Sequence, residues 1–251
     1  MDTLAGRNAL YIAAKAPRPG LAKTRLARGI GQRTAIDLYR AFLRDLGARF
    51  AAPAARRAFS LGWYITPPDA WDDLAPLVSP HTARDGARIL AQGPGDWTTR
   101  QEALFAGAWE RGEERTVLIA SDSPHLAVEV VAEAFRQLDR HDLVFGPVTD
   151  GGYYLIGMRG WCDVLRGIPM STGTVLQDIV ARARAQGRSV GYVAPTFDVD
   201  EASDLEQLVR VAANPLRGDL AATRAALREL GMIDGARQIA GSIDQAEAAA
   251  D

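Results

Sequence analysis

The stretch Thr116–Pro124 constrains the fold of this chain more than any other segment. Its four apolar residues, 117–120, form a short run that is typical of a strand buried on both faces of a sheet. The run ends in Ser-Asp-Ser-Pro, and Pro124 cannot continue a central strand. Asp122 is therefore expected beyond the carboxyl end of that strand, where open α/β sheets bind ligands. The alternative is that Asp122 only caps a helix that begins near Leu126.

Short apolar runs alternate with amphipathic runs along most of the chain, which predicts a single doubly wound α/β domain. Residues 1–214 are expected to form this domain, and residues 215–251 a C-terminal helical tail that packs on it or trails from it. The predicted strands cover residues 8–14, 58–66, 89–92, 117–120, 142–147, the aromatic-rich stretch before Met158, and 190–194. The predicted helices cover about residues 32–50, 69–78, 98–111, 127–138, 171–187 and 201–213.

The composition excludes several classes of function. The 29 basic and 31 acidic residues give a formal net charge of −2, which offers no broad basic surface for nucleic acid. The single cysteine, Cys162, excludes an internal disulfide and a cysteine-built metal site. No segment resembles a signal peptide or reaches membrane-spanning length, so we expect a cytoplasmic protein without a membrane partner. A homodimer is compatible with these features.

A basic loop follows the first predicted strand. From Lys15 through Ile36 the chain carries six basic residues and no acid, and the only two lysines of the protein are Lys15 and Lys23. A glycine-containing basic loop before a helix is a good anion site, because backbone N–H groups add to the cations. The loop lacks the Gly-Lys pair of a Walker A motif. We expect it to bind phosphate through five residues: Lys15, Arg18, Gly20, Lys23 and Arg25.

Further carboxylates follow later strands. Asp198 and Asp200 lie on one side if the chain there is extended, as a Mg²⁺ site would require, although Asp200 could instead cap the next helix. Asp150 precedes Gly151 and Gly152, which fits either a hairpin turn or a substrate-binding loop. Carboxylates facing phosphate require a divalent ion between them, so the combination predicts a nucleotide together with Mg²⁺ or Mn²⁺.

A serine hydrolase is a poor match to the sequence. The three histidines (His81, His125 and His141) are scattered, and no Gly-x-Ser-x-Gly elbow is present. His125 lies too near Ser121 and Ser123 in sequence to approach either hydroxyl easily as a base.

Four motifs together resemble the bacterial DUF2064 family, which is placed in the GT-A superfamily of nucleotide-diphospho-sugar transferases. The motifs are the loop Lys15–Leu26, Ser-Asp-Ser-Pro-His-Leu, Thr-Asp-Gly-Gly-Tyr-Tyr-Leu-Ile-Gly and Phe-Asp-Val-Asp-Glu-Ala-Ser-Asp-Leu. The resemblance spans about residues 8–212. The first motif also resembles the phosphate loop of small nucleotidyltransferases such as phospholactate guanylyltransferases.

The resemblance implies a three-layer α/β/α, Rossmann-like GT-A fold with a mostly parallel mixed sheet. It implies that Lys23 and Arg25 meet the phosphates of a nucleoside triphosphate (NTP), that Asp122 ligates Mg²⁺, and that Asp198 or Asp200 supplies a second carboxylate. Two departures stand out. Pro124 replaces the second acid of the Asp-x-Asp motif of many GT-A enzymes, and residues 96–100 replace a Leu-Gly-x-Arg-Met-like run.

The predicted activity is nucleotidyl transfer from an NTP to a small phosphorylated or acidic acceptor, with release of pyrophosphate. Lys23, Arg25 and Asp122 are the expected catalytic residues, Asp122, Asp198 and Asp200 the metal ligands, and Asp150, Gly151 and Gly152 substrate contacts. One alternative is a glycosyltransferase that uses a nucleotide-diphospho-sugar donor, which has less need of so basic a loop. A second is a nucleotide-binding regulator, which would not require the acids.

Overall fold

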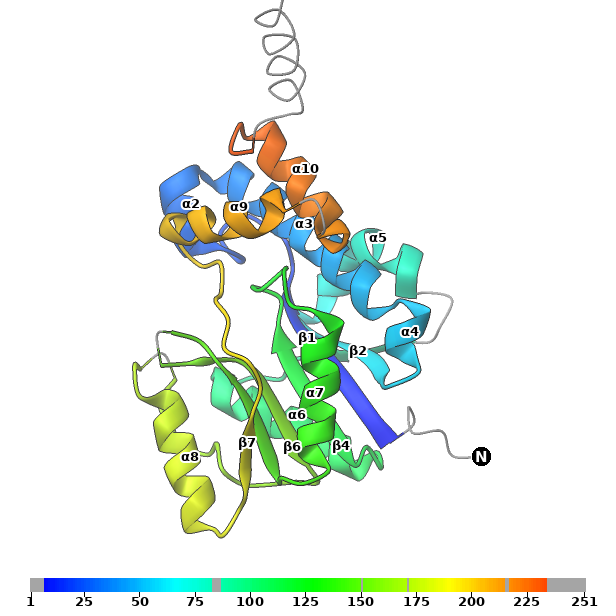
Figure 1. The fold of residues 1–251 in the computed structure, drawn as a ribbon, viewed down its shortest axis with the longest axis vertical. Coiled ribbons are helices and arrows are strands. Elements are labelled where there is room, and N and C mark those ends of the chain that lie inside the picture. Colours follow the sequence, from blue (N-terminus) through cyan, green and yellow to red (C-terminus); the bar gives the residue numbers. More distant parts are fainter. Residues whose placement is uncertain (1–6, 83–86, 150, 171, 215–216, 234–251) are drawn as a thin grey trace, which may run out of the picture.

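The computed structural model describes residues 7–82, 87–149, 151–170, 172–214 and 217–233. Seven strands form one sheet in the order β3-β2-β1-β4-β6-β5-β7 (Figure 1). Strand β6 is antiparallel to both of its neighbours, and the other paired strands are parallel. The strands are β1 (Asn8–Lys15), β2 (Ser60–Thr66), β3 (Arg88–Ala91), β4 (Arg115–Ala120), β5 (Leu143–Pro147), β6 (Tyr153–Arg159) and β7 (Val190–Tyr192).

Helices cover both faces of the sheet. The α-helices are α2 (Thr24–Ile30), α3 (Gln32–Phe50), α4 (Pro53–Arg56), α5 (Trp71–Thr82), α6 (Trp97–Glu110), α7 (Val128–Leu138), α8 (Val175–Ala185), α9 (Leu205–Ala213) and α10 (Ala221–Glu229). Three 3₁₀ turns lie at Pro68–Ala70, Ala202–Asp204 and Gly218–Leu220. Among the helices that the structure describes, none is long and apolar enough to cross a membrane.

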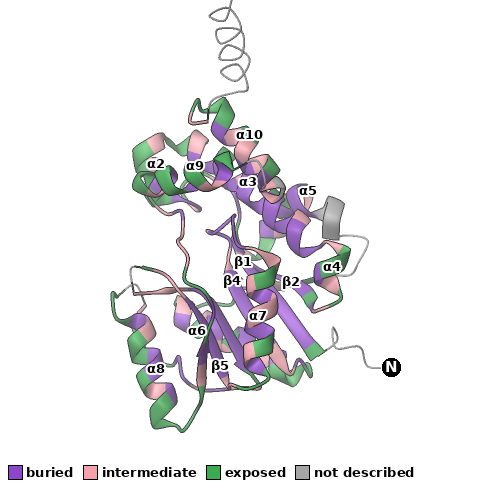
Figure 2. Cartoon of the chain, in the orientation of Figure 1, coloured by how far each residue is buried: buried purple, intermediate pink, exposed green. Residues whose placement is uncertain are grey.

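The core has two parts because successive side chains of a strand point to opposite faces. Ile12 of β1 packs in one cluster with residues of α3, α5 and α7, whereas its neighbour Tyr11 packs in the other with residues of α6 and α8. The strands between them are largely buried (Figure 2). The predicted three-layer fold with a mostly parallel mixed sheet is therefore confirmed.

The helix predicted from Ser171 begins later than expected. Ser171 lies outside the described residues, and α8 starts only at Val175. The residues before it form a turn instead, closed by a 3.3 Å hydrogen bond from the amide of Val175 to the carbonyl of Thr172. Thr172 and Gly173, in this turn, line a cleft.

The segment that contains α10 packs on α3. The buried carboxylate of Asp45 accepts hydrogen bonds of 2.9 and 2.8 Å from the amides of Ala222 and Thr223, which satisfies the first turn of α10. Arg49, also buried, donates to the carbonyls of Pro124 and Asp219. One turn of α3 thus anchors both α10 and the loop that follows β4.

Candidate active site

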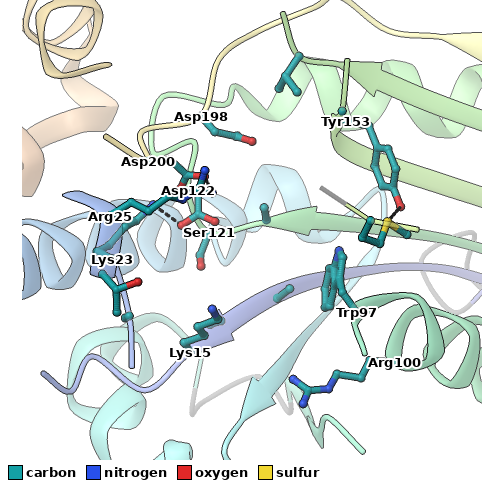
Figure 3. A pocket seen from close by; sticks show the side chains of 18 of the residues that line it. Lys15, Lys23, Arg25, Trp97, Arg100, Ser121, Asp122, Tyr153, Asp198 and Asp200 are labelled. Carbon is teal, nitrogen blue, oxygen red and sulfur yellow. Dashed lines mark hydrogen bonds and ion pairs between the residues drawn. The ribbon is translucent and has the colours of Figure 1, made fainter. Parts of the chain in front are cut away.

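A cleft of about 800 Å³ opens at the carboxyl edge of the parallel strands, where Lys15 ends β1 and Asp122 follows β4. Figure 3 shows its lining side chains. Its charged lining residues are Lys15, Lys23, Arg25, Arg100, Asp122, Asp198 and Asp200. The structure therefore brings together, in one cavity, most of the charged residues that the sequence singles out.

Asp122 does not cap the helix that follows it. Helix α7 has Ala127 at its N-cap position and no side-chain capping bond. The turn of Asp122 is fixed from two directions: its carbonyl accepts a 3.0 Å hydrogen bond from the amide of Val199, and the hydroxyl of Ser121 lies 2.8 Å from that of Tyr39. The Asp122 carboxylate, about one-third exposed, is thus presented to the cleft.

Lys23 is buried among the acids. Its backbone lies in the left-handed region (φ 50°) at the N-cap of α2, a conformation that costs about 1–2 kcal/mol for a residue with a side chain. Its side chain is only 3% exposed and its ammonium pairs with Asp122. The same ammonium donates to the carbonyl of Val199 at 2.7 Å and lies 3.4 Å from Asp200. These contacts offset the backbone strain and bring two carboxylates to one cation.

Asp200 belongs to the site and is not a helix cap. One of its oxygens pairs with Arg25 at 2.6 Å and the other faces Lys23. Glu201 and Asp204 form the cap instead: the side chain of Glu201 accepts the amide of Asp204, and the carboxylate of Asp204 accepts the amides of residues 200 and 201 at 2.8 and 2.7 Å. The alternative in which Asp200 caps the last helix of the domain is therefore wrong.

Asp198 differs from the other two carboxylates. It accepts a 2.5 Å hydrogen bond from the hydroxyl of Ser123, and it forms no ion pair with any residue that the structure describes. Burial, followed by the negative charges of Asp122 and Asp200, raises the pKa of Asp198 to about 7. Among the described residues, Asp198 is thus the carboxylate of the cleft without a direct ion pair, and the charge of Lys23 offsets its raised pKa only in part.

The three carboxylates fit a divalent cation by their chemistry. Mg²⁺ and Mn²⁺ prefer oxygen ligands, and Asp122 and Asp200 already share one cationic atom, the Nζ of Lys23. Within the described part of the chain, no three acidic, histidine or cysteine side chains stand ready-arranged around a metal position. A divalent cation would therefore have to compete with the Lys23 ammonium for Asp122 and Asp200.

Of the other residues predicted to bind phosphate, Lys15 lines the cleft, whereas Arg18 and Gly20 do not. Lys15 lines the cleft, its side chain is exposed, and it makes no ion pair with any described residue. Arg18 lies outside the cleft lining, where its guanidinium pairs with Asp69 and Asp73 at 2.9 and 2.6 Å. Gly20 takes a positive φ of 77° in the same loop and also does not line the cleft.

The Gly-Gly turn before β6 forms part of the rim. Asp150 lies outside the described residues. Gly152 lines the cleft, and Gly151 has a φ of 90° that favours glycine. A Cβ atom at Gly151 would lie 1.9 Å from the carbonyl oxygen of Gly173, so only a glycine allows these two loops to meet.

The opposite wall contains residues that the sequence analysis missed: Gln92, Trp97, Arg100, Tyr153 and Met170. In Figure 3, Trp97, Arg100 and Tyr153 lie on the far side of the cleft from the three carboxylates. The Tyr153 hydroxyl donates to Gln101 at 3.0 Å, and burial raises its pKa. For Gln92, directly after β3, and Tyr153, at the start of β6, position was the available signal, because both places meet the same edge of the sheet; Trp97 and Arg100 lie in α6, which follows the β3 loop.

Comparison with known proteins identifies relatives of the whole chain and of its fold. A protein from Desulfovibrio desulfuricans G20, provisionally described as a nucleotide-diphospho-sugar transferase, is 30% identical, with a TM-score of 0.77 over 91% of this chain and 99% of the other. The structure of 4-diphosphocytidyl-2C-methyl-D-erythritol synthase matches with a TM-score of 0.50 over 82% and 97% of the two chains; at 13% identity it shows the fold alone. No curated protein matches the chain. The family model described as "Uncharacterized protein conserved in bacteria (DUF2064)" matches residues 51–172, and together with the 30% identical relative this shows that the chain belongs to the DUF2064 family of GT-A-like proteins.

Proposed function

We propose that this protein is a divalent-cation-dependent transferase that moves a nucleotidyl group from an NTP to a small phosphorylated or acidic acceptor. The observation that carries the proposal is the meeting of Asp122, Asp198 and Asp200 with Lys23 in one cleft at the carboxyl edge of the sheet. Carboxylates in such a cleft repel a phosphate substrate unless a cation lies between them. The exposed Lys15 on the same cleft supplies a charge that such a substrate needs.

The proposed reaction is a single displacement at phosphorus. An oxygen of the acceptor attacks the α-phosphorus, the bond from that phosphorus to the β-phosphate oxygen breaks, and pyrophosphate leaves with the electron pair. A cation held by Asp122, Asp198 and Asp200 would offset charge on the phosphate oxygens. Lys15, Lys23 and Arg25 would orient the phosphates, and catalysis of this kind is mainly positioning and electrostatic stabilisation.

Glycosyl transfer from a nucleotide-diphospho-sugar is the second candidate. The 30% identical relative carries that description, although provisionally. The charges of Lys23 and Arg25 are also balanced by Asp122 and Asp200, which leaves Lys15 as the cation of the first loop that lines the cleft without an acidic partner among the described residues. The single charge of Lys15, unpaired within the described part of the chain, suits a diphosphate, which carries less negative charge than a triphosphate. A regulator without turnover is disfavoured, because it would have no use for three carboxylates in the cleft.

Binding and product analysis separate these candidates. The protein is titrated calorimetrically with the four NTPs and with a set of nucleotide-diphospho-sugars, each with and without Mg²⁺, and pyrophosphate release is followed. The proposal expects Mg²⁺-dependent binding of at least one NTP and pyrophosphate release once an acidic acceptor is present. Tight binding of a nucleotide sugar with no binding of any NTP would replace nucleotidyl transfer by glycosyl transfer.

A further inference from the structure

Arg100 lies on the cleft wall opposite the carboxylates and has an unusual environment. One of its guanidinium nitrogens donates to the side-chain oxygen of Gln92 at 3.3 Å, and its buried Nε has no hydrogen-bond partner in the described part of the chain. Gln92 is itself fixed, because its amide nitrogen donates to the carbonyl of Tyr64 at 2.8 Å. The carbonyl of Arg100 in turn accepts the Tyr64 hydroxyl at 2.6 Å. Neutral groups thus hold this guanidinium in place.

Arg100 lacks a direct acidic partner among the residues that the structure describes. Lys23 and Arg25, which line the same cleft, both pair with carboxylates, whereas Arg100 forms no such ion pair. The exposed carboxylate of Asp96 attracts Arg100 only from beyond ion-pair distance, and its Oδ1 accepts hydrogen bonds from the amide and hydroxyl of Thr99 at 2.8 and 2.7 Å. A partly buried guanidinium without an anion is destabilising, and an anionic ligand relieves this more than a neutral base does.

Arg100 and the three carboxylates line opposite sides of the cleft (Figure 3). In Figure 3, Trp97 and Arg100 lie across the cleft from Asp122, so a phosphate held by a cation at Asp122 is separate from the group at Arg100. Trp97 and Tyr153, on the same side of the cleft as Arg100 (Figure 3), provide aromatic surface that can cover the body of a small molecule. The cleft therefore offers two anion positions.

We propose that Arg100, positioned by Gln92, binds the phosphate or carboxylate group of the acceptor and selects for acidic acceptors. This rests on the proposed function, since an acceptor is meaningful only for a transferase. Both anions suit a guanidinium fork, which can bond two oxygens at once. Arg100 is a binding residue in this scheme, and Gln92 acts only by fixing its orientation.

Calorimetry with inorganic phosphate as the acceptor-group probe tests the proposal. Wild type, Arg100→Gln and Arg100→Lys are titrated with phosphate and, in separate runs, with the four NTPs in Mg²⁺. Arg136→Gln is the matched control, because Arg136 is an exposed arginine on α7 that pairs with Glu133 away from the cleft. Arg100→Gln is expected to weaken phosphate binding about ten- to a hundredfold. Its NTP affinity should stay within about twofold of wild type, while Arg100→Lys keeps part of the phosphate affinity.

The other outcomes either overturn the proposal or assign Arg100 a different role. If wild type does not bind phosphate, or if both Arg100 variants bind it as wild type does, the proposal is overturned. A parallel loss of NTP and phosphate affinity would assign Arg100 to the nucleotide phosphates, and a lost preference among the four NTPs would assign it to the base. Absence of NTP binding by wild type contradicts the proposed nucleotidyl transfer alone, since the phosphate titration is read separately.

Discussion

The amide of Val199 donates a 3.0 Å hydrogen bond to the carbonyl of Asp122, which joins two loops that are far apart in the sequence. This bond places Asp198 and Asp200, the two neighbours of Val199, on either side of the position that faces Asp122. The ammonium of Lys23 reinforces it, because it touches the carbonyl of Val199 as well as the carboxylates of Asp122 and Asp200. At the acidic end of the cleft, the loops that carry Lys23, Asp122 and residues 198–200 therefore meet around the buried side chain of Lys23.

Asp122→Asn should abolish turnover and leave the protein folded. The proposed cation would lose a ligand, and even changes to residues that only support metal ligands reduce activity about 10–100-fold. The free energy of unfolding should fall by no more than about 2 kcal/mol, because Lys23 keeps Asp200 and the carbonyl of Val199. Turnover of the nucleotide donor measures the loss of activity, and urea denaturation measures the change in the free energy of unfolding. Asp37→Asn, at an exposed pair with Arg40, is the control, and retained turnover in Asp122→Asn would remove this residue from the metal site.

Asp198→Asn and Asp200→Asn should each raise the concentration of Mg²⁺ or Mn²⁺ needed for half-maximal activity, by about tenfold or more. We expect the larger effect at Asp200, because Asp200 shares a cationic partner with Asp122 and Asp198 does not. The measurement is a metal titration at a fixed nucleotide concentration. An unchanged metal requirement in both variants would show that neither carboxylate binds the cation.

Gly151→Ala should destabilise the rim of the cleft. The new Cβ would meet the carbonyl oxygen of Gly173 in a backbone with φ of 90°, so overpacking of about 1–3 kcal/mol adds to conformational strain of about 1–2 kcal/mol. Gly187→Ala is the matched control, since Gly187 has a φ of 69° with open space around its Cβ and should show the strain alone. Urea denaturation compares the two. Equal losses of stability would mean that the two loops can move apart freely.

His125 should make the stability of the fold depend on pH. Its ring is stacked on Phe197 at 4.0 Å and bonded to the hydroxyl of Thr196 at 2.7 Å. Burial, followed by the positive charges of Arg217 and Arg49, lowers its pKa from 6.5 to about 4, and Asp219 opposes this only in part. Because the unfolded chain takes up a proton near pH 6.5 and the folded chain does not, stability is lost as the pH falls from about 6.5 to about 4.

Urea denaturation of wild type and His125→Gln at pH 7 and pH 5 measures this contribution. Wild type should lose about 2 kcal/mol more than the variant between the two pH values, since each pKa unit corresponds to about 1.4 kcal/mol. The carboxyl groups that titrate in the same pH range are present in both proteins, so their contributions to stability cancel in the difference between wild type and variant. An identical loss in both proteins would show that His125 takes up its proton without unfolding.

Much of the fold follows from local patterns in the sequence. Buried strands such as β1 and β4 are continuous apolar runs, and the turn residues that end them put Lys15 and Asp122 at one edge of the sheet. Helix starts were harder to predict. Four acids lie within seven residues after Phe197, and spacing alone cannot show that Glu201 and Asp204 form the cap while Asp200 turns toward Lys23 and Arg25.

The charge balance of the site could not be predicted, because it depends on contacts between distant segments. The sequence shows Lys23 as part of a one-sided basic loop, whereas the fold pairs it with Asp122 and Asp200 and turns Arg18 toward Asp69 and Asp73. Arg100 shows the converse. It lies in an ordinary mixed-charge stretch, and only the fold shows that Glu102 pairs with Arg166 and that Asp96 accepts hydrogen bonds from Thr99 and forms no ion pair with Arg100.

Lys23→Met should change metal binding and nucleotide binding in opposite directions. The methionine keeps the buried stem of the side chain but removes the ammonium that now lies between Asp122 and Asp200. Without that competing charge, Mn²⁺ alone should bind more tightly, by about tenfold. NTP affinity in Mg²⁺ should fall about ten- to a hundredfold, because each charge-assisted contact to phosphate is worth roughly 1.5–3 kcal/mol.

Calorimetric titration of wild type, Lys23→Met and Arg25→Met tests both parts. Arg25 is the comparison, because it is exposed and Asp200 is its one acidic partner among the described residues, so its loss should change Mn²⁺ affinity less. Unchanged Mn²⁺ affinity in Lys23→Met would mean that the Lys23 ammonium does not occupy the position where the divalent cation binds. Unchanged NTP affinity would mean that Lys23 only balances the acids. If instead both fall together, Lys23 shapes the loop that carries Asp200, and its removal disorders the acidic end of the cleft as a whole.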